Sequence, residues 1–330
     1  MLLLTVKMNK FNIYFLKTLR KAWGKVFHEE HLKPLQRIAD YDIISDIVFK
    51  LLIGKEPCMI ARYGAFELGV VCNYLGIKSN NHSVLNFMRG ISQEWWWNEK
   101  LLDSLNKNAR VFPNNHQIAE KFSLLMLEDS KLLDVLASWQ KNEQLLADYI
   151  PESVIKVDRD NLNPFFAKRP WTHALEGKRV VVIHPFYQSI NSQYKRKSKI
   201  FPNGFLPDFS LRVIPAVQSI GGKHSNYSNW FEALEWMKNE LDKESYDIAL
   251  LGCGAYGFPL AAHAKRTGHK AVHLGGSLQL FFGIKGKRWE GNGYVNGPNN
   301  YSSFFNDYWI RPSISETPKS FMNIENGCYW

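Results

Sequence analysis

The chain has 330 residues, of which 45% are hydrophobic and 22% charged, and its 41 lysines and arginines exceed its 31 acidic residues by ten. This composition excludes a mostly disordered or collagen-like chain. Its four cysteines are scattered without a C-x-x-C pair and no apolar run approaches the roughly 20 residues of a membrane helix, so we expect a reduced, cytoplasmic, globular protein with neither a zinc knuckle nor a disulfide framework.

The positive excess is concentrated in two windows of the sequence. Residues 1–28 hold six basic residues and no acid, and residues 248–289 hold six more, again without an acid. The rest of the chain is close to neutral. The charge distribution therefore predicts two local anionic partners, and it argues against nucleic-acid binding over a broad surface.

The first predicted element is an amphipathic helix over residues 10–27, within an N-terminal segment of residues 1–32. Lysines occupy one side of this helix, and the other carries an i, i+4 row of large apolar residues, namely Phe11, Phe15, Leu19 and Trp23. Two interpretations remain open. The helix could make peripheral contact with an anionic membrane surface or a partner groove, or it could pack its apolar row on its own domain.

From residue 33 onward, helix-length segments alternate with short apolar runs. Helices are expected near 34–53, 65–76, 92–107, 115–137 and 229–243. Strands are expected at Met59–Tyr63, Arg110–Pro113, Arg179–His184, Leu211–Ala216, Asp247–Leu251 and Ala271–Leu274. This alternation predicts an α/β fold with a Rossmann-like, mostly parallel sheet and helices on both faces. We expect a single domain over residues 33–330, with the proline-containing stretch 151–178 as the candidate joint between two lobes.

A glycine motif follows the expected strand that ends at Leu251. Gly252, Gly254 and Gly257 complete G-x-G-x-x-G, in which glycines allow a tight turn and let backbone N–H groups approach a phosphate. A dinucleotide-binding oxidoreductase would add an Asp or Glu about 20 residues later to bind the ribose. No acid occurs in residues 248–289, so no NAD is expected, although an NADP enzyme could use a cation there.

A second glycine turn, Gly275-Gly276, follows the next expected strand, and three cations come shortly after it, Lys285, Lys287 and Arg288. Two strand-to-glycine turns at the carboxyl edge of one sheet, accompanied by cations, predict a diphosphate pocket. The alternative is that the glycines only permit close helix–strand packing and that the cations are solvated.

An earlier motif lies where the first expected strand meets a helix, with Arg62, Gly64 and Glu67 in the segment RYGAFE. Arg62 falls at the carboxyl end of the strand, which is a usual place for ligand contacts. Glu67 falls in the first helical turn, where a carboxylate is favourable to the helix dipole whatever else it does. A binding role for Glu67 therefore depends on its two companions.

These segments resemble those of a known group of proteins. RYGAFE, GCGAYG, the run LGGSLQLFFGIKGKRW and the terminal ENGCYW are similar to a family of bacterial proteins associated with surface-polysaccharide synthesis, which resembles the GT-D-type glycosyltransferases. The resemblance covers the chain from about residue 55 to the end. It implies a nucleoside-diphosphate sugar as donor and a glycan or a lipid-linked molecule as acceptor.

In the GT-D enzymes the early motif is R-x-G-D-G-E, whose Asp and Glu hold a divalent metal and the sugar nucleotide. Arg62, Gly64 and Glu67 match that pattern, whereas Ala65 and Phe66 replace the Asp and the second Gly. A hard cation takes several oxygen ligands, so the loss of one carboxylate puts Mn²⁺ or Mg²⁺ binding at Glu67 in question. We therefore expect Glu67 to bind hydroxyls of the donor, and we expect the diphosphate to be neutralised by Lys285, Lys287 and Arg288.

Glycosyl transfer needs stabilisation of the leaving group and, for inversion, a base that takes the acceptor proton. Candidates for the base are Glu67, His184 and Asp208. The alternative for His184 is a hydrogen-bonded histidine at a strand end. The expected donor-binding residues are Arg62, Gly64, Gly252, Gly254, Tyr256, Gly257, Gly275, Gly276, Gln279, Lys285, Lys287 and Arg288.

Two aromatic clusters are also informative. Trp95-Trp96-Trp97 is expected on a helix, where three consecutive residues cannot all face one core, so at least one should be exposed or line a cleft. The aromatic terminal residues of ENGCYW should dock back on the domain, near the site.

The sequence thus favours a cytoplasmic glycosyltransferase that acts in surface-polysaccharide synthesis, peripheral to the inner face of the cell membrane if the N-terminal helix binds lipid. A non-catalytic nucleotide- or glycan-binding subunit of a polysaccharide assembly system is the second hypothesis. An NAD(P)-dependent oxidoreductase is the third.

Overall fold

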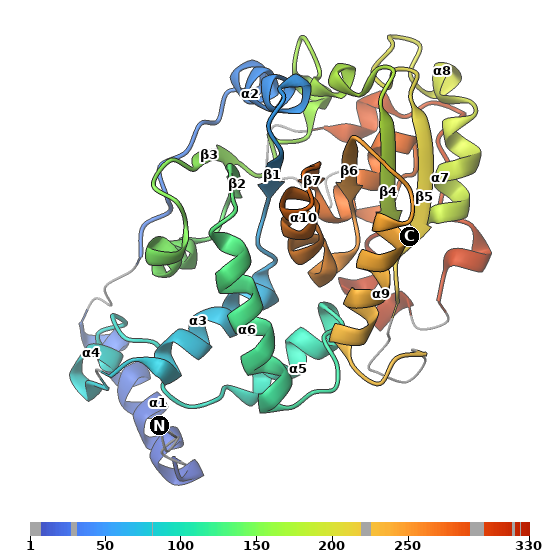
Figure 1. Cartoon of the computed structure of the whole chain (residues 1–330). Helices are drawn as coiled ribbons and strands as arrows, with labels where there is room; N and C mark the ends of the chain where they lie inside the picture. The colour runs from blue at the N-terminus through green and yellow to red at the C-terminus, as the bar shows by residue number, and fades with distance from the viewer. Residues whose placement is uncertain are drawn as a thin grey trace.

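The computed structural model describes residues 8–27, 32–80, 82–218, 226–290, 300–318, 321–323 and 325–330. At its centre is a seven-stranded parallel sheet with the strand order β3-β2-β1-β7-β6-β4-β5 (Figure 1). The strands are β1 (Cys58–Ala61), β2 (Val135–Ser138), β3 (Ile155–Asp158), β4 (Arg179–His184), β5 (Ser210–Pro215), β6 (Ile248–Leu251) and β7 (Lys270–His273). The predicted Rossmann-like α/β fold is confirmed.

The strand side chains alternate between two hydrophobic cores, one on each face of the sheet. In β1, Met59 and Ala61 belong to one core, whereas Cys58 and Ile60 belong to the other. Because both faces are covered, the strands between the two edges of the sheet are short, largely continuous apolar runs. This is why most of these inner strands were visible in the sequence as compact hydrophobic segments.

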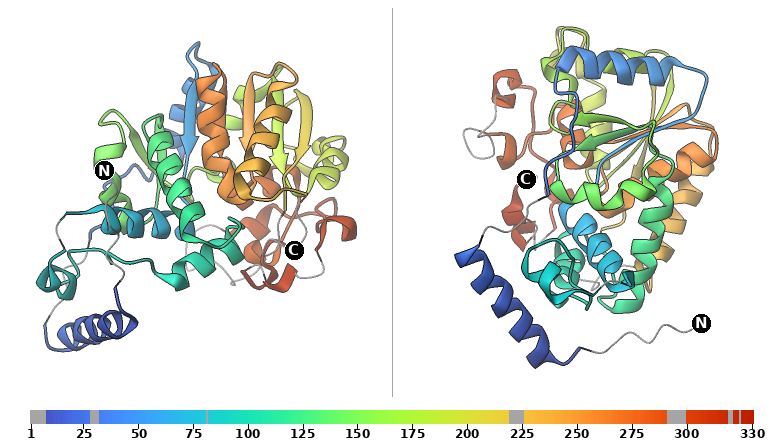
Figure 2. Two further views of the ribbon diagram at one scale, coloured as in Figure 1. Left: turned by 60° about the horizontal axis from the view of Figure 1, so that its bottom comes forward. Right: turned by 90° about the vertical axis from the view of Figure 1, so that its left-hand side faces the viewer.

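Helices cover both faces of the sheet (Figure 2). The first core is completed by α3 (Ala65–Lys78), α5 (Glu99–Asn108), α6 (His116–Ser130), α9 (Trp230–Asp242) and α10 (Gly257–Arg266). The second core is completed by α2 (Tyr41–Ile53), α7 (Tyr187–Tyr194), α8 (Lys197–Ile200) and the 3₁₀ segments η3 (Trp171–Leu175) and η5 (Gly275–Phe282).

Side-chain caps decide where several helices begin. Asp40 accepts a hydrogen bond from the backbone N–H of Ile43, so α2 starts at Tyr41 and not at residue 34. Asn115 and Asn229 cap α6 and α9 in the same way. Such caps satisfy backbone donors that the first helical turn leaves unpaired.

Two strands were not predicted. The segment 115–137 was expected to be one helix, but α6 ends at Ser130 and β2 follows at Val135–Ser138. The stretch 151–178 was expected to join two lobes, but it contains β3, which pairs with β2. Strands before and after this stretch therefore belong to one sheet. A buried four-residue strand is difficult to distinguish from helix by periodicity alone.

The predicted strand Arg110–Pro113 does not form. Arg110 has a left-handed backbone with φ of 63°, which interrupts any strand, and the Phe112–Pro113 peptide bond is cis. Val111 and Phe112 are instead buried in the first core as irregular chain. The apolar character of this run reflects burial and not strand pairing.

The three tryptophans also differ from expectation, because they precede helix α5 and do not lie on it. Asn98 caps α5, which begins at Glu99. Trp96 is buried, whereas Trp95 and Trp97 are partly exposed. Trp95 and Trp96 pack in the cluster of Leu16 and Phe87, whereas Trp97 packs on the first core, so the three do not face one core.

The predicted N-terminal helix is present as α1 (Lys10–Val26). It packs against α4 (Val84–Met88), with Leu16 in a small cluster with Phe87 and Trp96. Residues 1–7 and 28–31 of the predicted N-terminal segment lie outside the described residues. None of the helices that the structure describes has the length and apolar character to cross a bilayer.

Candidate functional site

A cavity of about 770 Å³ lies at the carboxyl edge of the sheet. Residues at or just after the ends of all seven strands line it. From β1 the chain adds β2 and then β3 toward one edge of the sheet, and it then crosses to the other half of the sheet, where β4 lies. In open α/β sheets such a change of direction leaves a crevice in which ligands bind.

Most of the predicted site residues meet in this cavity. It is lined by Arg62, Gly64, Glu67, His184, Gly252, Gly254, Tyr256, Gly275, Gly276, Gln279 and Arg288. Residues 62–67 and 252–256 are far apart in the sequence, but parallel strands bring their carboxyl ends to one edge. Four predicted residues do not line the cavity, namely Asp208, Gly257, Lys285 and Lys287.

Asp208 is displaced because it precedes a strand and does not follow one. It lies two residues before β5, at the opposite edge of the sheet from the cavity. Its carboxylate is almost fully exposed and pairs with Lys197. The structure therefore does not support Asp208 as a catalytic base.

The predicted trio of cations contributes only Arg288. Lys287 is exposed, and the ammonium of Lys285 lies 6.0 Å from the centre of the Phe305 ring. Further back in the same acid-free window, Lys265 pairs with Asp134 at 2.7 Å and Arg266 pairs with Asp129. The positive window in the sequence is thus not a positive patch in the structure, because acids from another segment neutralise part of it.

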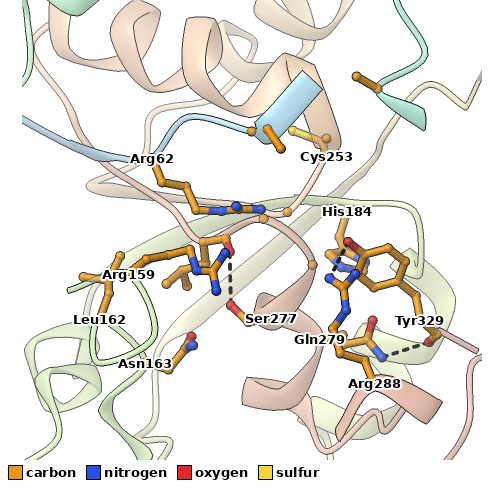
Figure 3. A pocket seen from close by; sticks show the side chains of 18 of the residues that line it. Arg62, Arg159, Leu162, Asn163, His184, Cys253, Ser277, Gln279, Arg288 and Tyr329 are labelled. Atoms are coloured by element: carbon orange, nitrogen blue, oxygen red, sulfur yellow. Dashed lines mark hydrogen bonds between the residues drawn. The ribbon is translucent and has the colours of Figure 1, made fainter. Parts of the chain in front are cut away.

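Positive charge reaches the cavity through a different set of side chains, which we name the arginine cluster: Arg62, Arg110, Arg159 and Arg288. They come from four separate segments of the chain. Figure 3 shows the guanidinium of Arg62 extending across the cavity, with Arg159 on one side and Arg288 on the other. Guanidinium groups in such an arrangement can pair with a multiply charged anion, and three carboxylates, Glu67, Asp158 and Asp160, line the same cavity.

Arg62 is the most deeply buried member of the cluster. Its Nε atom has no hydrogen-bond partner among the described residues. Burial lowers the pKa of its guanidinium, Arg159 and Arg288 lower it further, and Tyr329 and Glu67 act in the opposite direction. An incompletely paired buried cation is costly. The Nε–H of Arg62 is therefore available to donate a hydrogen bond to an anionic ligand.

Aromatic rings orient two other members. The guanidinium carbon of Arg159 lies 4.1 Å from the centre of the Trp139 ring, and Arg159 pairs with Asp160 at 2.8 Å. Arg288 lies over Tyr329 at 4.5 Å and donates a 2.8 Å hydrogen bond to its hydroxyl. Stacking of this kind fixes the plane of a guanidinium before any ligand arrives.

The terminal aromatic residues dock at the cavity, as predicted. Tyr329 and Trp330 both line it, and Gln279 Nε2 donates a 3.1 Å hydrogen bond to the carbonyl of Tyr329. The Tyr329 ring occupies the space that a side chain at Gly276 would need, since a Cβ atom there would lie 2.0 Å from Cε1 of the ring. Gly276 thus makes room for a protein side chain.

Glu67 lies in the first turn of α3, and its carboxylate folds back over Gly64. A Cβ atom at Gly64 would lie 2.0 Å from Glu67 Oε2. Ala65 provides no oxygen ligand, and no group of three His, Cys, Asp or Glu side chains among the described residues could hold a metal ion. The motif is a poor fit for Mn²⁺ or Mg²⁺, which require several oxygens, and we derive no step through a metal.

His184 is held as a neutral hydrogen-bond donor. Its Nδ1 accepts a 3.0 Å hydrogen bond from the backbone N–H of Phe186, so the proton of the neutral ring is on Nε2. Burial lowers its pKa to about 3. This ring therefore cannot serve as the base predicted for it, whereas its Nε2–H can donate to a ligand.

The glycines of the first turn have separate structural roles. A Cβ atom at Gly252 would lie 2.5 Å from Cδ2 of His184, so this glycine admits the imidazole. A Cβ atom at Gly257 would lie 2.3 Å from Cδ2 of His273, so this glycine lets α10 pack on β7. For Gly257, the packing interpretation weighed from the sequence is correct.

Gly254 and Gly275 form a matched pair for mutation, because their φ angles are 61° and 63°. A Cβ atom at Gly254 would meet open space, whereas one at Gly275 would lie 2.2 Å from Arg62 Nη2. We expect Gly254→Ala to lower the free energy of unfolding by about 1 kcal/mol through backbone strain alone. Gly275→Ala should cost about 1–3 kcal/mol more because of the collision. Urea denaturation measures both, and equal losses would contradict the placement of Arg62.

Several polar atoms at the cavity also have no partner among the described residues. Besides Arg62 Nε they include Asn163 Oδ1, Tyr256 Oη, Gln279 Oε1 and Trp330 Nε1. Buried polar atoms are nearly always hydrogen-bonded in folded proteins. Those at the cavity are therefore positioned to hydrogen-bond with a polar ligand.

Among the lining residues that were not predicted from the sequence are five that carry the argument for the site, namely Arg110, Trp139, Arg159, Asp160 and Asn163. Four of them follow β2 or β3, the two strands that were not predicted. The fifth, Arg110, lies in the run assigned to a strand. Alternation of apolar and charged residues in Ile155–Asp158 was the one available signal, since it is typical of an edge strand with one solvated face.

No family model, curated protein or solved structure matches this chain.

Proposed function

We propose that the protein is a glycosyltransferase that binds a nucleoside-diphosphate sugar in the cavity and transfers the sugar to a glycan or lipid-linked acceptor in surface-polysaccharide synthesis. The arginine cluster around the unpaired Nε of Arg62 is the observation that carries the proposal. A diphosphate offers charge and oxygen acceptors on two sides, which suits guanidinium groups approaching from different segments. The motifs that resemble GT-D enzymes support the same donor.

The cluster also supplies the chemistry that transfer needs. Negative charge grows on the diphosphate as its bond to the sugar breaks, and fixed cations in a cavity stabilise this charge without reorganisation. The Nε2–H of His184 is a further donor for the leaving group. Neither group needs to change its protonation state.

The remaining polar groups suit a sugar or a nucleoside. Asn163 and Gln279 each keep an amide oxygen without a partner among the described residues, and amide oxygens accept hydrogen bonds from hydroxyls. Phe66 and Trp139 line the cavity as partly exposed rings. A few directional polar groups among aromatic walls are typical of small-molecule sites.

Glu67 is our candidate for the base that accepts the acceptor's proton. It is buried in the cavity wall beside the arginine cluster. Asp158 and Asp160 also line the cavity, but neither belongs to the RYGAFE motif that carries the resemblance to the GT-D enzymes. We therefore assign the proton transfer to Glu67.

A non-catalytic binding subunit is the second candidate, and two observations favour it. His184 is locked as a donor, and Ala65 replaces the first carboxylate of the motif, which leaves Glu67 as the single acid of the β1–α3 turn. Such a site would bind the donor without breaking it.

The first stage of the test is a calorimetric binding screen. UDP, GDP, CMP, their sugars, NAD(P) and inorganic pyrophosphate would each be titrated with and without Mn²⁺. We expect a nucleoside diphosphate and its sugar to bind, and pyrophosphate to compete with them. Binding of NAD(P) alone would contradict the proposal.

The second stage separates a transferase from a binding subunit by measuring sugar release from the bound donor. We expect the wild type to release sugar slowly and Glu67→Gln to lose release while it keeps its affinity for the nucleotide. Lys287→Ala is the matched control, since Lys287 is exposed and outside the cavity, and it should release sugar at the wild-type rate. Binding without release by the wild type would favour the second candidate.

A further inference from the structure

The N-terminal helix α1 has two apolar sides, and only one of them packs on the protein. The inner side carries Ile13 and Leu16, which join the cluster of Phe87 and Trp96. The outer side exposes Phe11 (72%), Tyr14 (75%), Phe15 (53%) and Val26 (74%). The packing alternative for the predicted helix therefore accounts for only part of its apolar surface.

More than half of the exposed large apolar side chains in the described chain lie in α1, at its C-cap, or in and near α4. Fourteen large hydrophobic residues are exposed, and eight of them belong to α1, its C-cap or the vicinity of α4: Phe11, Tyr14, Phe15, Val26, Phe27, Val84, Leu85 and Ile91. Scattered exposed hydrophobic residues are normal, but a cluster of this kind marks an interaction surface.

The charge on α1 identifies the partner. Lys10, Lys21 and Lys25 are exposed on the helix, and no acidic residue occurs in residues 1–28. Two other basic residues instead attach the helix to the protein. Lys17 pairs with Glu94 at 3.0 Å, and the guanidinium of Arg20 lies 5.1 Å from the centre of the Phe87 ring.

We infer that α1 binds an anionic lipid bilayer with its axis in the plane of the interface. Aromatic side chains would enter the boundary between headgroups and acyl chains, while the lysines contact the headgroups. A second copy of α1 is a poor partner, because the same positive side chains would face one another. In Figure 1 the strands' arrowheads point toward the half of the molecule that carries α1, so binding would turn the carboxyl edge of the sheet toward the membrane.

Vesicle co-sedimentation of the full chain tests this inference without reference to any enzymatic activity. We expect binding to vesicles of phosphatidylcholine mixed with phosphatidylglycerol, little binding to phosphatidylcholine alone, and weaker binding as salt is raised. Changing Phe11 and Phe15 together to serine should lower the partition coefficient at least about tenfold. Each of Lys10→Gln, Lys21→Gln and Lys25→Gln should lower it about fivefold.

Matched controls come from exposed residues elsewhere. Ile53→Ser and Leu124→Ser remove apolar side chains that are about half exposed, and Lys100→Gln, Lys107→Gln and Lys121→Gln remove exposed charges. None should alter binding. The inference would be overturned if the protein bound neutral vesicles with equal affinity or bound no vesicles. It would also be overturned by an oligomer in size-exclusion chromatography that dissociates when Phe11 and Phe15 are changed to serine.

Discussion

Replacing Arg62 with methionine is expected to weaken the binding of inorganic pyrophosphate by about 100-fold, which corresponds to the loss of about 3 kcal/mol from charge-assisted hydrogen bonds. Arg62 extends across the cavity, and its Nε has no partner among the described residues. An anion in the cavity would complete its hydrogen bonding. Isothermal titration calorimetry measures the change directly.

The same substitution should leave the free energy of unfolding unchanged or raise it by about 1–2 kcal/mol, because a buried, incompletely paired cation costs more in the folded state than an apolar chain of similar length. Opposite effects on stability and binding are typical of a group retained for function. Urea denaturation of the ligand-free protein tests this part.

Lys287→Met is the control for the Arg62 substitution. Lys287 is the sequence neighbour of Arg288, which lines the cavity, but its own side chain is exposed and lies outside the cavity. The substitution therefore removes a positive charge without touching the site. Its affinity for pyrophosphate should stay within about twofold of the wild type, as expected for a screened surface charge. If Arg62→Met lost several kcal/mol of stability and bound pyrophosphate normally, Arg62 would be a structural residue.

Acidification is expected to destabilise the protein before most carboxylates titrate. Burial lowers the pKa values of His184 and His273 to about 3, and Arg62 contributes at His273. An unfolded chain binds protons at these residues below about pH 6.5. The neutral histidines therefore contribute fully to the free energy of unfolding above that pH, and this contribution is lost as the pH falls toward 3. At pH 5 the loss is about 2 kcal/mol for each histidine.

Two buried carboxyls, Asp129 and Glu143, act in the opposite direction, because burial raises the pKa of each. Burial, partly offset by Arg266, raises the pKa of Asp129 to about 6. The folded state therefore binds this proton more tightly, and stability increases as the pH falls from about 6 toward 4. At pH 5 the gain at Asp129 is about 1.4 kcal/mol, which is well below the combined loss at the two histidines, so we expect a net loss of stability.

Urea denaturation at pH 7.5 and pH 5.0 measures this difference. In His184→Asn the amide oxygen can accept the backbone N–H of Phe186 in place of Nδ1, so this variant should fold and lose about half of the histidine effect. Asp129→Asn should make the acid loss larger, because it removes one of the opposing groups. A stability that does not change between the two pH values would contradict the buried, neutral state of both histidines.

The parts of the fold that local sequence specifies were predicted well. β4, β6 and β7 are apolar runs followed by glycine or proline, and their turns contributed Gly252, Gly254 and Gly275 to the cavity. Short-range patterns suffice there, since a strand and its turn are neighbours in the chain. The docking of Tyr329 was predicted because exposed aromatic residues at a chain end are unfavourable.

The arginine cluster could not be predicted in the same way. Arg62 occupies the space that Gly275 leaves empty, and no local pattern joins residues more than 200 positions apart. Arg110 depends on a left-handed turn, and Arg159 depends on recognition of β3. Conversely, Lys287 was assigned to the site because it neighbours Arg288 in sequence, but adjacent residues of a 3₁₀ turn point in different directions.

The strand order has a consequence for the synthesis of the protein. β1 emerges early from the ribosome, but its two neighbours in the sheet are β2 and β7, and β7 starts at Lys270, more than 200 residues later. Until then one edge of the central strand has no partner, and such edges can pair with other chains. Long-range parallel pairing is also slow. The nascent protein is therefore expected to depend on protection of this edge until the last strand is made.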